Sequence, residues 1–201
     1  FEGSFRKIPE LLKNPLLVCL YLLILLVFTA HYTAYSYIEP FMRQVGNISE
    51  NAATFVLLLF GAAGIVGSVI FSRWGDRFNT RLMLISTILM LVSMLALLLA
   101  VASVWALSFI ALLWGTALML LIISMQAKVI MVDVNAQDML MSMFSGIINL
   151  GIGTGALFGG YAVTHLSLSS VGYTGAAIAV VALLLMLFMI NRFPELSKRL
   201  G

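Results

Sequence analysis

A short segment near the amino terminus gathers polar side chains that could contact a ligand. His31, Tyr32, Tyr35 and Ser36 interrupt an apolar run that extends over residues 15–38. On a helix, their spacing places the four side chains along one stripe. Imidazole and phenol groups donate and accept hydrogen bonds, and tyrosine rings also stack on flat ligands. The pattern therefore predicts a stripe of ligand-binding residues.

Three further residues are candidates because they are polar or aromatic in apolar surroundings. Trp114 lies near the middle of its apolar run, Gln126 lies near the end of the same run, and Asn149 lies near the middle of the next. Gln126 and Asn149 could each line a ligand pathway or could instead only bond to a neighbouring helix, whereas the position of Trp114 makes a role in an aromatic belt less natural. All three are predicted here as ligand-binding candidates, with that alternative left open.

The composition predicts that these side chains lie within a membrane. Of the 201 residues, 62% are hydrophobic and 9% are charged, and the mean hydropathy is +1.11. Soluble domains carry roughly 25% charged residues, so this chain has too few to cover a water-facing surface. Six runs are long enough to cross the hydrocarbon core as helices, at residues 15–38, 52–74, 82–101, 104–127, 139–164 and 171–190. The predicted fold class is all-α transmembrane.

Within a membrane, the polar stripe needs partners that lipid does not provide. It is therefore expected to face protein or a water-filled cavity. The alternative is an aromatic belt at the outer interface, which Tyr37 and Phe41 fit well. His31, Tyr32 and Tyr35 lie deeper in the span, which favours the cavity.

The basic residues indicate how the spans are oriented. If the first residues are cytoplasmic, every Lys and Arg except Arg43 falls on the cytoplasmic side, as is usual for membrane proteins. The net charge of +3 is thus a sign of topology and does not indicate a nucleic-acid partner. We predict a cytoplasmic linker at residues 1–14, a six-helix bundle at residues 15–191 and a cytoplasmic tail at residues 192–201. Lys128 is expected to extend its amine to the cytoplasmic interface.

The loop between the second and third predicted spans carries a recognisable motif, Ser72-Arg73-Trp74-Gly75-Asp76-Arg77-Phe78-Asn79-Thr80-Arg81. It resembles the loop signature of the major facilitator superfamily, which runs Gly, three residues, Asp-Arg, one residue, Gly and two basic residues. Asp76, Arg77 and Arg81 match the signature; Ser72, Asn79 and Thr80 depart from it, which favours the eroded copy found in the second half of such proteins. An Asp that caps a helix start beside arginines can hold helix ends together, so the three matching residues are predicted to form a cytoplasmic gate. A basic loop that only sets the orientation is the simpler alternative.

Glycines recur every four residues in the fifth predicted span, at Gly151, Gly155 and Gly159. This spacing lines one helix face and lets another helix approach closely. The segment resembles the glycine-rich helix of superfamily antiporters, although Ala156 stands where the first-half version has proline. We predict that the three glycines form a helix-packing surface.

Two longer segments carry a narrower resemblance. Residues 30–40 read Ala-His-Tyr-Thr-Ala-Tyr-Ser-Tyr-Ile-Glu-Pro and residues 144–153 read Phe-Ser-Gly-Ile-Ile-Asn-Leu-Gly-Ile-Gly. Together they resemble bacterial sugar efflux transporters of the drug:proton antiporter branch, over essentially the whole chain. The resemblance implies the carboxy-terminal half of a twelve-helix protein of the bacterial inner membrane, built as two inverted three-helix repeats. The first residue, Phe1, is not a methionine, which agrees with a piece of a longer protein.

The same resemblance implies a function and a set of partners. The expected activity is proton-coupled export of sugars or sugar analogues by alternating access. The expected partners are the substrate, protons, the lipid bilayer and the amino-terminal six-helix half. No carboxylate lies in the middle of a predicted span, so a proton-carrying acid would belong to that other half.

Other functions remain as alternatives. A multidrug exporter of the same superfamily comes first, and a six-helix membrane protein that transports nothing comes second. An intramembrane serine protease would need glycine two residues before Ser145, where Met143 stands. The sequence contains no metal-ligand cluster, phosphate loop or paired carboxylates, so no catalytic residue, metal or cofactor is predicted.

Overall fold

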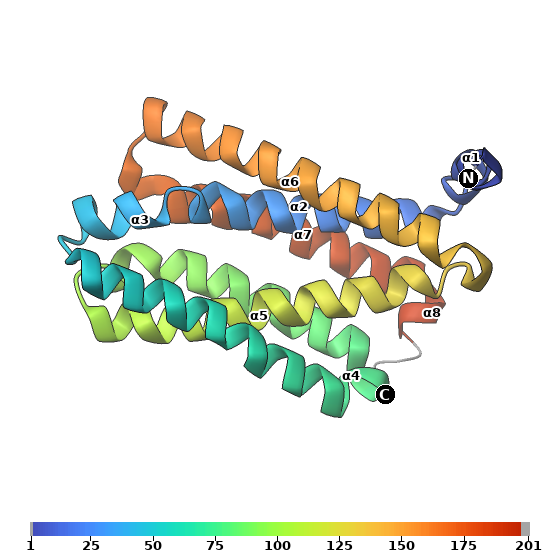
Figure 1. Ribbon diagram of the computed structural model, residues 1–201, viewed down its shortest axis with the longest axis horizontal. Coiled ribbons are helices and arrows are strands. Elements are labelled where there is room, and N and C mark those ends of the chain that lie inside the picture. The colour runs from blue at the N-terminus through green and yellow to red at the C-terminus, as the bar shows by residue number, and fades with distance from the viewer. Residues whose placement is uncertain (1, 198–201) are drawn as a thin grey trace.

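The computed structural model describes residues 2–197, and this part of the chain is helical without a strand (Figure 1). The long helices are α2 (Pro15–Tyr35), α4 (Glu50–Ala100), α5 (Val104–Ile130), α6 (Gln137–His165) and α7 (Val171–Arg192). The short elements are α1 (Glu2–Leu11), α3 (Ile38–Pro40), a π-helix at Phe41–Val45, α8 (Pro194–Ser197) and 3-10 turns at Val134–Ala136 and Leu168–Ser170. The predicted all-α transmembrane class is confirmed.

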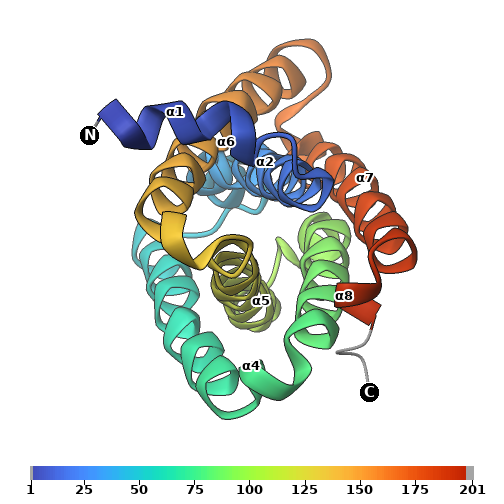
Figure 2. The same ribbon diagram turned by 90° about the vertical axis from the view of Figure 1, so that its right-hand side faces the viewer.

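Helix α4 contains two spans. Its 51 residues would measure about 77 Å if straight, more than twice the hydrocarbon thickness of about 30 Å. Phe78 leaves the helical conformation, with φ −122° and ψ 29°, and the chain reverses there. Figure 2 shows the first arm (residues 50–77) and the second arm (residues 79–100) on either side of α5. The five long apolar helices therefore provide the six predicted spans.

Local signals in the sequence account for where several helices begin and end. The Asn14 side chain accepts a hydrogen bond from the Leu16 backbone amide at 3.0 Å, and Ser49 and Ser103 cap α4 and α5 in the same way. The first span was predicted to reach residue 38, but α2 ends at Tyr35. Tyr37 is non-helical, with φ −118° and ψ 18°, and the short α3 starts after it.

The helices interlock as two three-helix units. The first unit is α2 with the two arms of α4, and the second is α5, α6 and α7. Helix α2 packs against α6 and α7, while α5 packs against α4 (Figure 2). The first helix of each unit thus lies against the other two helices of the opposite unit, as expected for two inverted repeats.

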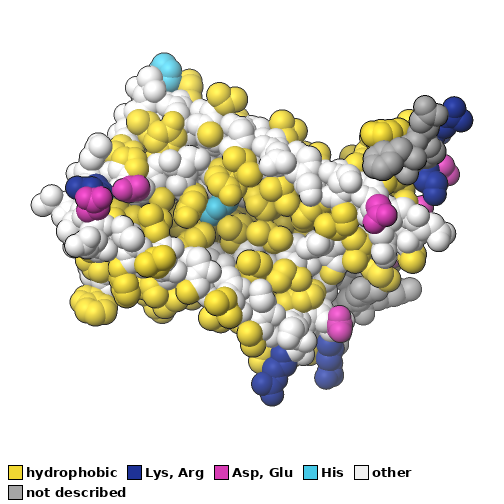
Figure 3. Space-filling view, viewed as in Figure 1, with side chains coloured by type: hydrophobic (Ala, Val, Ile, Leu, Met, Phe, Trp, Pro, Cys, Tyr) yellow, Lys and Arg dark blue, Asp and Glu magenta, His cyan; other side chains and the backbone are white. Residues whose placement is uncertain are grey.

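Charged side chains gather at the two ends of the bundle, and the belt between them is apolar (Figure 3). The first and last described helices, α1 and α8, lie at the same end of the bundle (Figure 1). At the opposite end, the guanidinium of Arg43 lies 3.7 Å from the carboxylate of Glu50. Two basic residues assigned to the tail, Lys198 and Arg199, lie outside the described residues.

We expect Tyr21→Phe to weaken the contact between α2 and α6. The buried Tyr21 hydroxyl donates to the Leu140 carbonyl oxygen across that contact, at 2.9 Å. Loss of one such hydrogen bond should lower the free energy of unfolding by about 1 kcal/mol, measured by denaturant titration in detergent micelles. Tyr173→Phe, at an exposed position, is the matched control and should have little effect.

Candidate functional site

Five aromatic side chains from three helices form one cluster, here called the aromatic box: His31, Tyr32 and Tyr35 of α2, Phe60 of the first arm of α4, and Trp114 of α5. The His31 ring stacks on Phe60 with centroids 5.7 Å apart and planes 12° apart. Trp114 meets both rings edge-on, at 5.4 Å from His31 and 5.5 Å from Phe60. These separations lie within the favourable range for aromatic pairs.

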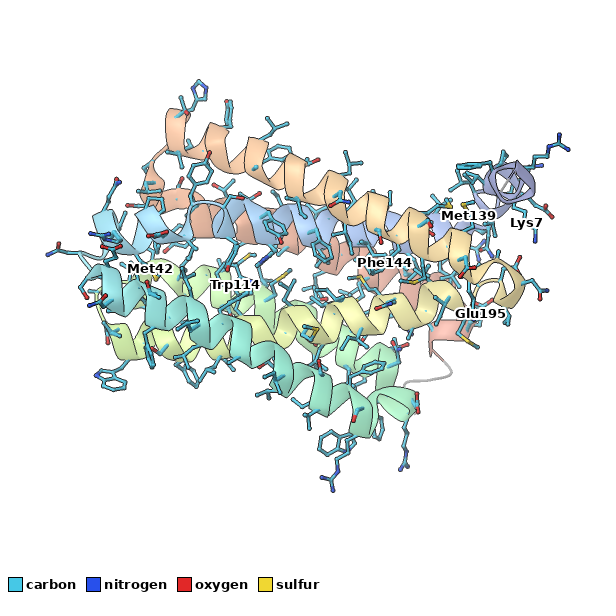
Figure 4. The ribbon with its side chains drawn as sticks, in the orientation of Figure 1. Lys7, Met42, Trp114, Met139, Phe144 and Glu195 are labelled. Carbon is cyan, nitrogen blue, oxygen red and sulfur yellow. The ribbon has the colours of Figure 1, made fainter. Side chains whose placement is uncertain are left out.

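The centre of the aromatic box, His31 and Trp114, is buried, whereas its open edge, formed by the other three rings, is partly exposed. His31 and Trp114 are each only 2% exposed, and the other three rings are partly buried. Figure 4 places Trp114 in the seam between α2 and α5. The His31 Nδ1 and Trp114 Nε1 atoms have no hydrogen-bond partner among the described residues. Buried polar atoms normally have a hydrogen-bond partner, so these two nitrogen atoms are candidates to bond to a group from outside the box.

A small cavity of about 20 Å³ adjoins the aromatic box. Its walls are Tyr35, Ile38, Met42, Val56, Leu57, Phe60, Leu97, Leu107, Ile110, Ala111 and Trp114. This volume is close to that of a single water, so this cavity cannot enclose a sugar. A larger ligand would have to approach the box from its open edge.

The remaining predicted ligand-binding residues lie outside the aromatic box. Ser36 and Asn149 are exposed, and Asn149 lies on α6, which supplies no side chain to the box. Gln126 is partly buried, and its Nε2 atom lies 3.7 Å from the Met141 sulfur on α6. The structure therefore brings His31, Tyr32, Tyr35 and Trp114 together, but not Ser36, Gln126 or Asn149.

Phe60 belongs to the site although nothing in the sequence distinguishes it. It lies within an apolar run of α4 and has the residue type expected for lipid or core packing. Only its stacking on His31 and its centroid distance of 5.0 Å to Tyr35 reveal its role.

The three glycines predicted as a packing surface lie against α2. A Cβ atom placed on Gly151 or Gly155 would lie 2.6 Å from the Cβ atom of Phe28 or Tyr32, respectively. One placed on Gly159 would lie 2.5 Å from the Thr33 carbonyl oxygen. Their close contacts are thus made within this bundle.

Other glycines face away from the bundle. Cβ atoms placed on Gly61, Gly146 and Gly153 would meet no atom within 4 Å. They lie at exposed positions of the first arm of α4 and of α6, and Gly146 and Gly153 are within about one helical turn of the exposed Asn149. Small and polar residues on the outside of membrane spans fit contact with further protein better than contact with lipid.

The predicted cytoplasmic gate has a different local structure from the one expected. Asp76 lies two residues before the break at Phe78, so it is not at the start of the returning arm, and the capping role proposed for it is wrong. Asp76, Arg77 and Arg81 are all exposed. The two guanidinium groups lie over the Phe78 ring, at 5.1 Å for Arg77 and 5.5 Å for Arg81.

Two residues that depart from the loop signature make the buried contacts at this turn. The Asn79 side chain donates to the Ser124 carbonyl oxygen at 3.3 Å, and the Lys128 ammonium donates to the Thr80 hydroxyl at 2.7 Å. Lys128 is only 7% exposed. The prediction that its amine reaches the cytoplasmic interface is therefore wrong, because the reversal of α4 supplies a buried acceptor.

Comparison with known families agrees with this architecture. The family model of the Major Facilitator Superfamily matches residues 11–200, nearly the whole chain. The match covers all six spans, the interlocked three-helix units and the loop at the reversal of α4. The chain belongs to the Major Facilitator Superfamily, a family of secondary transporters in the lipid bilayer.

Proposed function

We propose that this chain is the carboxy-terminal half of a proton-coupled exporter of sugars or sugar analogues in the bacterial inner membrane. The aromatic box is the observation that carries this proposal. Its rings come from α2 and α5, the first helices of the two interlocked units, and from α4. Aromatic faces with nearby hydrogen-bonding groups suit the mixed apolar and hydroxylated surface of a sugar.

The polar residues outside the aromatic box support a pathway that continues along the open surface. Ser36 and Asn149 are exposed on membrane-spanning helices, where lipid would leave their polar groups without partners. In a twelve-helix protein, the amino-terminal half would cover this surface. Substrate would then bind between the halves, and rocking of the halves would open the site to each side in turn.

A multidrug exporter is the second candidate, and the cavity beside the box favours it. The cavity itself is too small for a drug, but the apolar and aromatic side chains that line it would suit a hydrophobic drug or a lipophilic cation bound at the open edge of the box. The gate residues Asp76, Arg77 and Arg81 would serve either substrate class, because they lie at the turn between the arms of α4 and away from the box.

Counterflow into proteoliposomes made with the complete protein distinguishes these functions. We expect arabinose-like sugars and thiogalactosides to exchange, and an imposed pH gradient to drive their net movement. Exchange of hydrophobic cations without sugars would establish the multidrug function instead. Exchange of neither class would contradict the proposal.

We expect Tyr35→Ala and Asn149→Ala to impair transport without impairing membrane insertion. Loss of a substrate contact worth about 1 to 3 kcal/mol corresponds to roughly a 5- to 100-fold fall in counterflow at low substrate concentration. Tyr161→Ala and Asn191→Ala remove the same side chains at exposed positions near the helix ends and should transport normally. Normal transport by both test variants would show that Tyr35 and Asn149 do not contact the substrate and serve only in packing.

A further inference from the structure

Helix α1 lies across the end of the bundle instead of along it. Figure 1 shows α1 nearly end-on while the spans run across the view, and Figure 2 shows it beside α6 and extending past the outline of the bundle. Its 10 residues make a helix of about 15 Å, which is about half of the hydrocarbon thickness. Helix α1 is therefore too short to span the membrane and lies parallel to its plane.

The apolar and charged residues of this segment lie on opposite sides of the helix. Phe5 and Leu12 are seven residues apart, or two turns, and so share one side. Arg6, Glu10 and Lys13 follow one another at spacings of four and three residues and share the other side. Phe5 is 60% exposed and Leu12 is 45% exposed. The helix thus presents an apolar side that no other part of the described chain covers.

Contacts with the bundle fix how α1 is turned. Leu11 is buried in the core, and Lys7, Glu10 and Asn14 line a groove against the loop between α5 and α6. Figure 3 shows the hydrophobic side chains of α1 on the side nearer the apolar belt of the bundle and its basic side chains on the side away from it. The uncovered apolar side therefore faces the level at which lipid surrounds the bundle.

Pro9 indicates the depth at which α1 lies. It stands inside the helix and has no N–H group, so the Phe5 carbonyl oxygen lacks the backbone donor normally found four residues later. In the hydrocarbon core no water could replace that donor, whereas water reaches the level of the lipid headgroups. Helix α1 therefore fits the interface of the membrane and not its core.

The charges at this end of the molecule favour acidic lipid. Residues 1–14 carry three basic residues, Arg6, Lys7 and Lys13, against Glu2 and Glu10. The reversal of α4 lies at the same end and adds three exposed arginines and one exposed aspartate. Such an excess of basic groups attracts negatively charged phospholipids, and the attraction is strongest within a Debye length of the surface.

We infer that α1 is an interfacial helix that binds acidic phospholipids of the membrane surface, with Phe5 and Leu12 inserted among the upper parts of the acyl chains. Arg6 and Lys13, on the opposite side, lie at the level of the lipid phosphates. Burial of apolar side chains and attraction of charges act together in such helices. The partner is the bilayer itself, so this contact does not depend on which substrate is transported.

Spin labels on the two sides of α1 test its depth in the complete protein. Phe5→Cys and Glu10→Cys each receive a nitroxide, after the other cysteines have been replaced, in vesicles of phosphatidylcholine and phosphatidylglycerol. Oxygen concentrates in lipid and a nickel chelate stays in water, so collisions with each reveal the surroundings of the label. We expect oxygen to dominate at position 5 and nickel to dominate at the matched control, position 10.

Two results would overturn the insertion of α1. Equal nickel exposure of the two labels would place both sides of the helix in water. Protection of the label at position 5 from both oxygen and nickel would show that the apolar side of α1 is covered by further protein and not by lipid.

The part played by acidic lipid is tested with the same label at position 5. In phosphatidylcholine alone, or with Arg6→Gln or Lys13→Gln, we expect the inserted population to fall, by about fivefold for each basic residue lost. Arg43→Gln is the matched control, because Arg43 is exposed at the opposite end of the bundle, and should have no effect. Concentrated salt should act like the loss of charge in acidic vesicles and should have little effect in neutral ones. Equal insertion in both lipids at every salt concentration would overturn the recognition of acidic phospholipids.

Discussion

Gly155→Val should lower the free energy of unfolding by about 3 kcal/mol, the largest effect expected of any single substitution considered. A Cβ atom at this position would lie 2.6 Å from the Tyr32 Cβ and 2.8 Å from the Thr29 carbonyl oxygen. The carbonyl belongs to the α2 backbone and cannot rotate away, so α6 has to move off α2. Denaturant titration of the protein in detergent micelles would measure the loss.

Gly153→Val provides the matched control on the same helix. A Cβ atom at Gly153 meets nothing within 4 Å, although the change in side chain is identical. The control therefore keeps the effect of helix propensity and removes the steric conflict. Equal destabilisation by the two variants would contradict a close contact between α6 and α2 at Gly155.

Displacement of α6 should also affect the aromatic box, because the residue that Gly155 contacts is Tyr32. The Tyr32 ring lies 4.6 Å from the His31 ring, centroid to centroid. We therefore expect Gly155→Val protein that still inserts to transport poorly as well. The packing surface predicted from glycine spacing thus helps to position the site.

Thr80→Val should lower the free energy of unfolding by about 2 kcal/mol. The Thr80 hydroxyl accepts a hydrogen bond from the buried Lys128 ammonium at 2.7 Å, and valine has almost the same shape without that acceptor. A hydrogen bond to a charged group contributes more than a neutral one, and its loss removes one acceptor from a buried ammonium. The same detergent titration measures the change.

A second substitution tests whether the buried charge causes that loss. Replacing Lys128 by Met in the Thr80→Val protein should recover part of the stability, because no charge then remains buried at this point. Thr54→Val is the control, since its exposed hydroxyl bonds only to the Glu50 carbonyl oxygen of the same helix, and should change stability by less than about 0.5 kcal/mol. If Thr80→Val does not lower the free energy of unfolding, or if adding Lys128→Met does not restore part of it, then the buried charge of Lys128 is not the cause of the loss.

Spans and family could be predicted because they depend on patterns that are local in the sequence. A membrane span needs about 20 apolar residues whatever it packs against, so the six runs were recognised from hydropathy alone. The loop motif around Asp76 and Arg77 pointed to the superfamily, which the family match confirms. Sugar specificity, proton coupling and the cytoplasmic orientation remain predictions from the sequence.

Contacts between distant residues were decided only by the tertiary structure. Lys128 and Thr80 are 48 residues apart, and their hydrogen bond exists because α4 reverses at Phe78 beside the end of α5. In the sequence, Phe60 does not differ from other apolar residues. In the structure, the packing of the helices stacks its ring on His31. The stripe on α2 likewise predicted which polar side chains share a face, but not that His31 would be sealed while Ser36 stays exposed.

The sequence by itself thus determined the helices, the reversals between them and the superfamily, because helix formation and membrane insertion depend on a few neighbouring residues. Only the tertiary structure decided which side chains meet in the aromatic box and which glycines contact α2. Those contacts depend on how six helices rotate and pack against one another, and that information is spread over residues far apart in the chain.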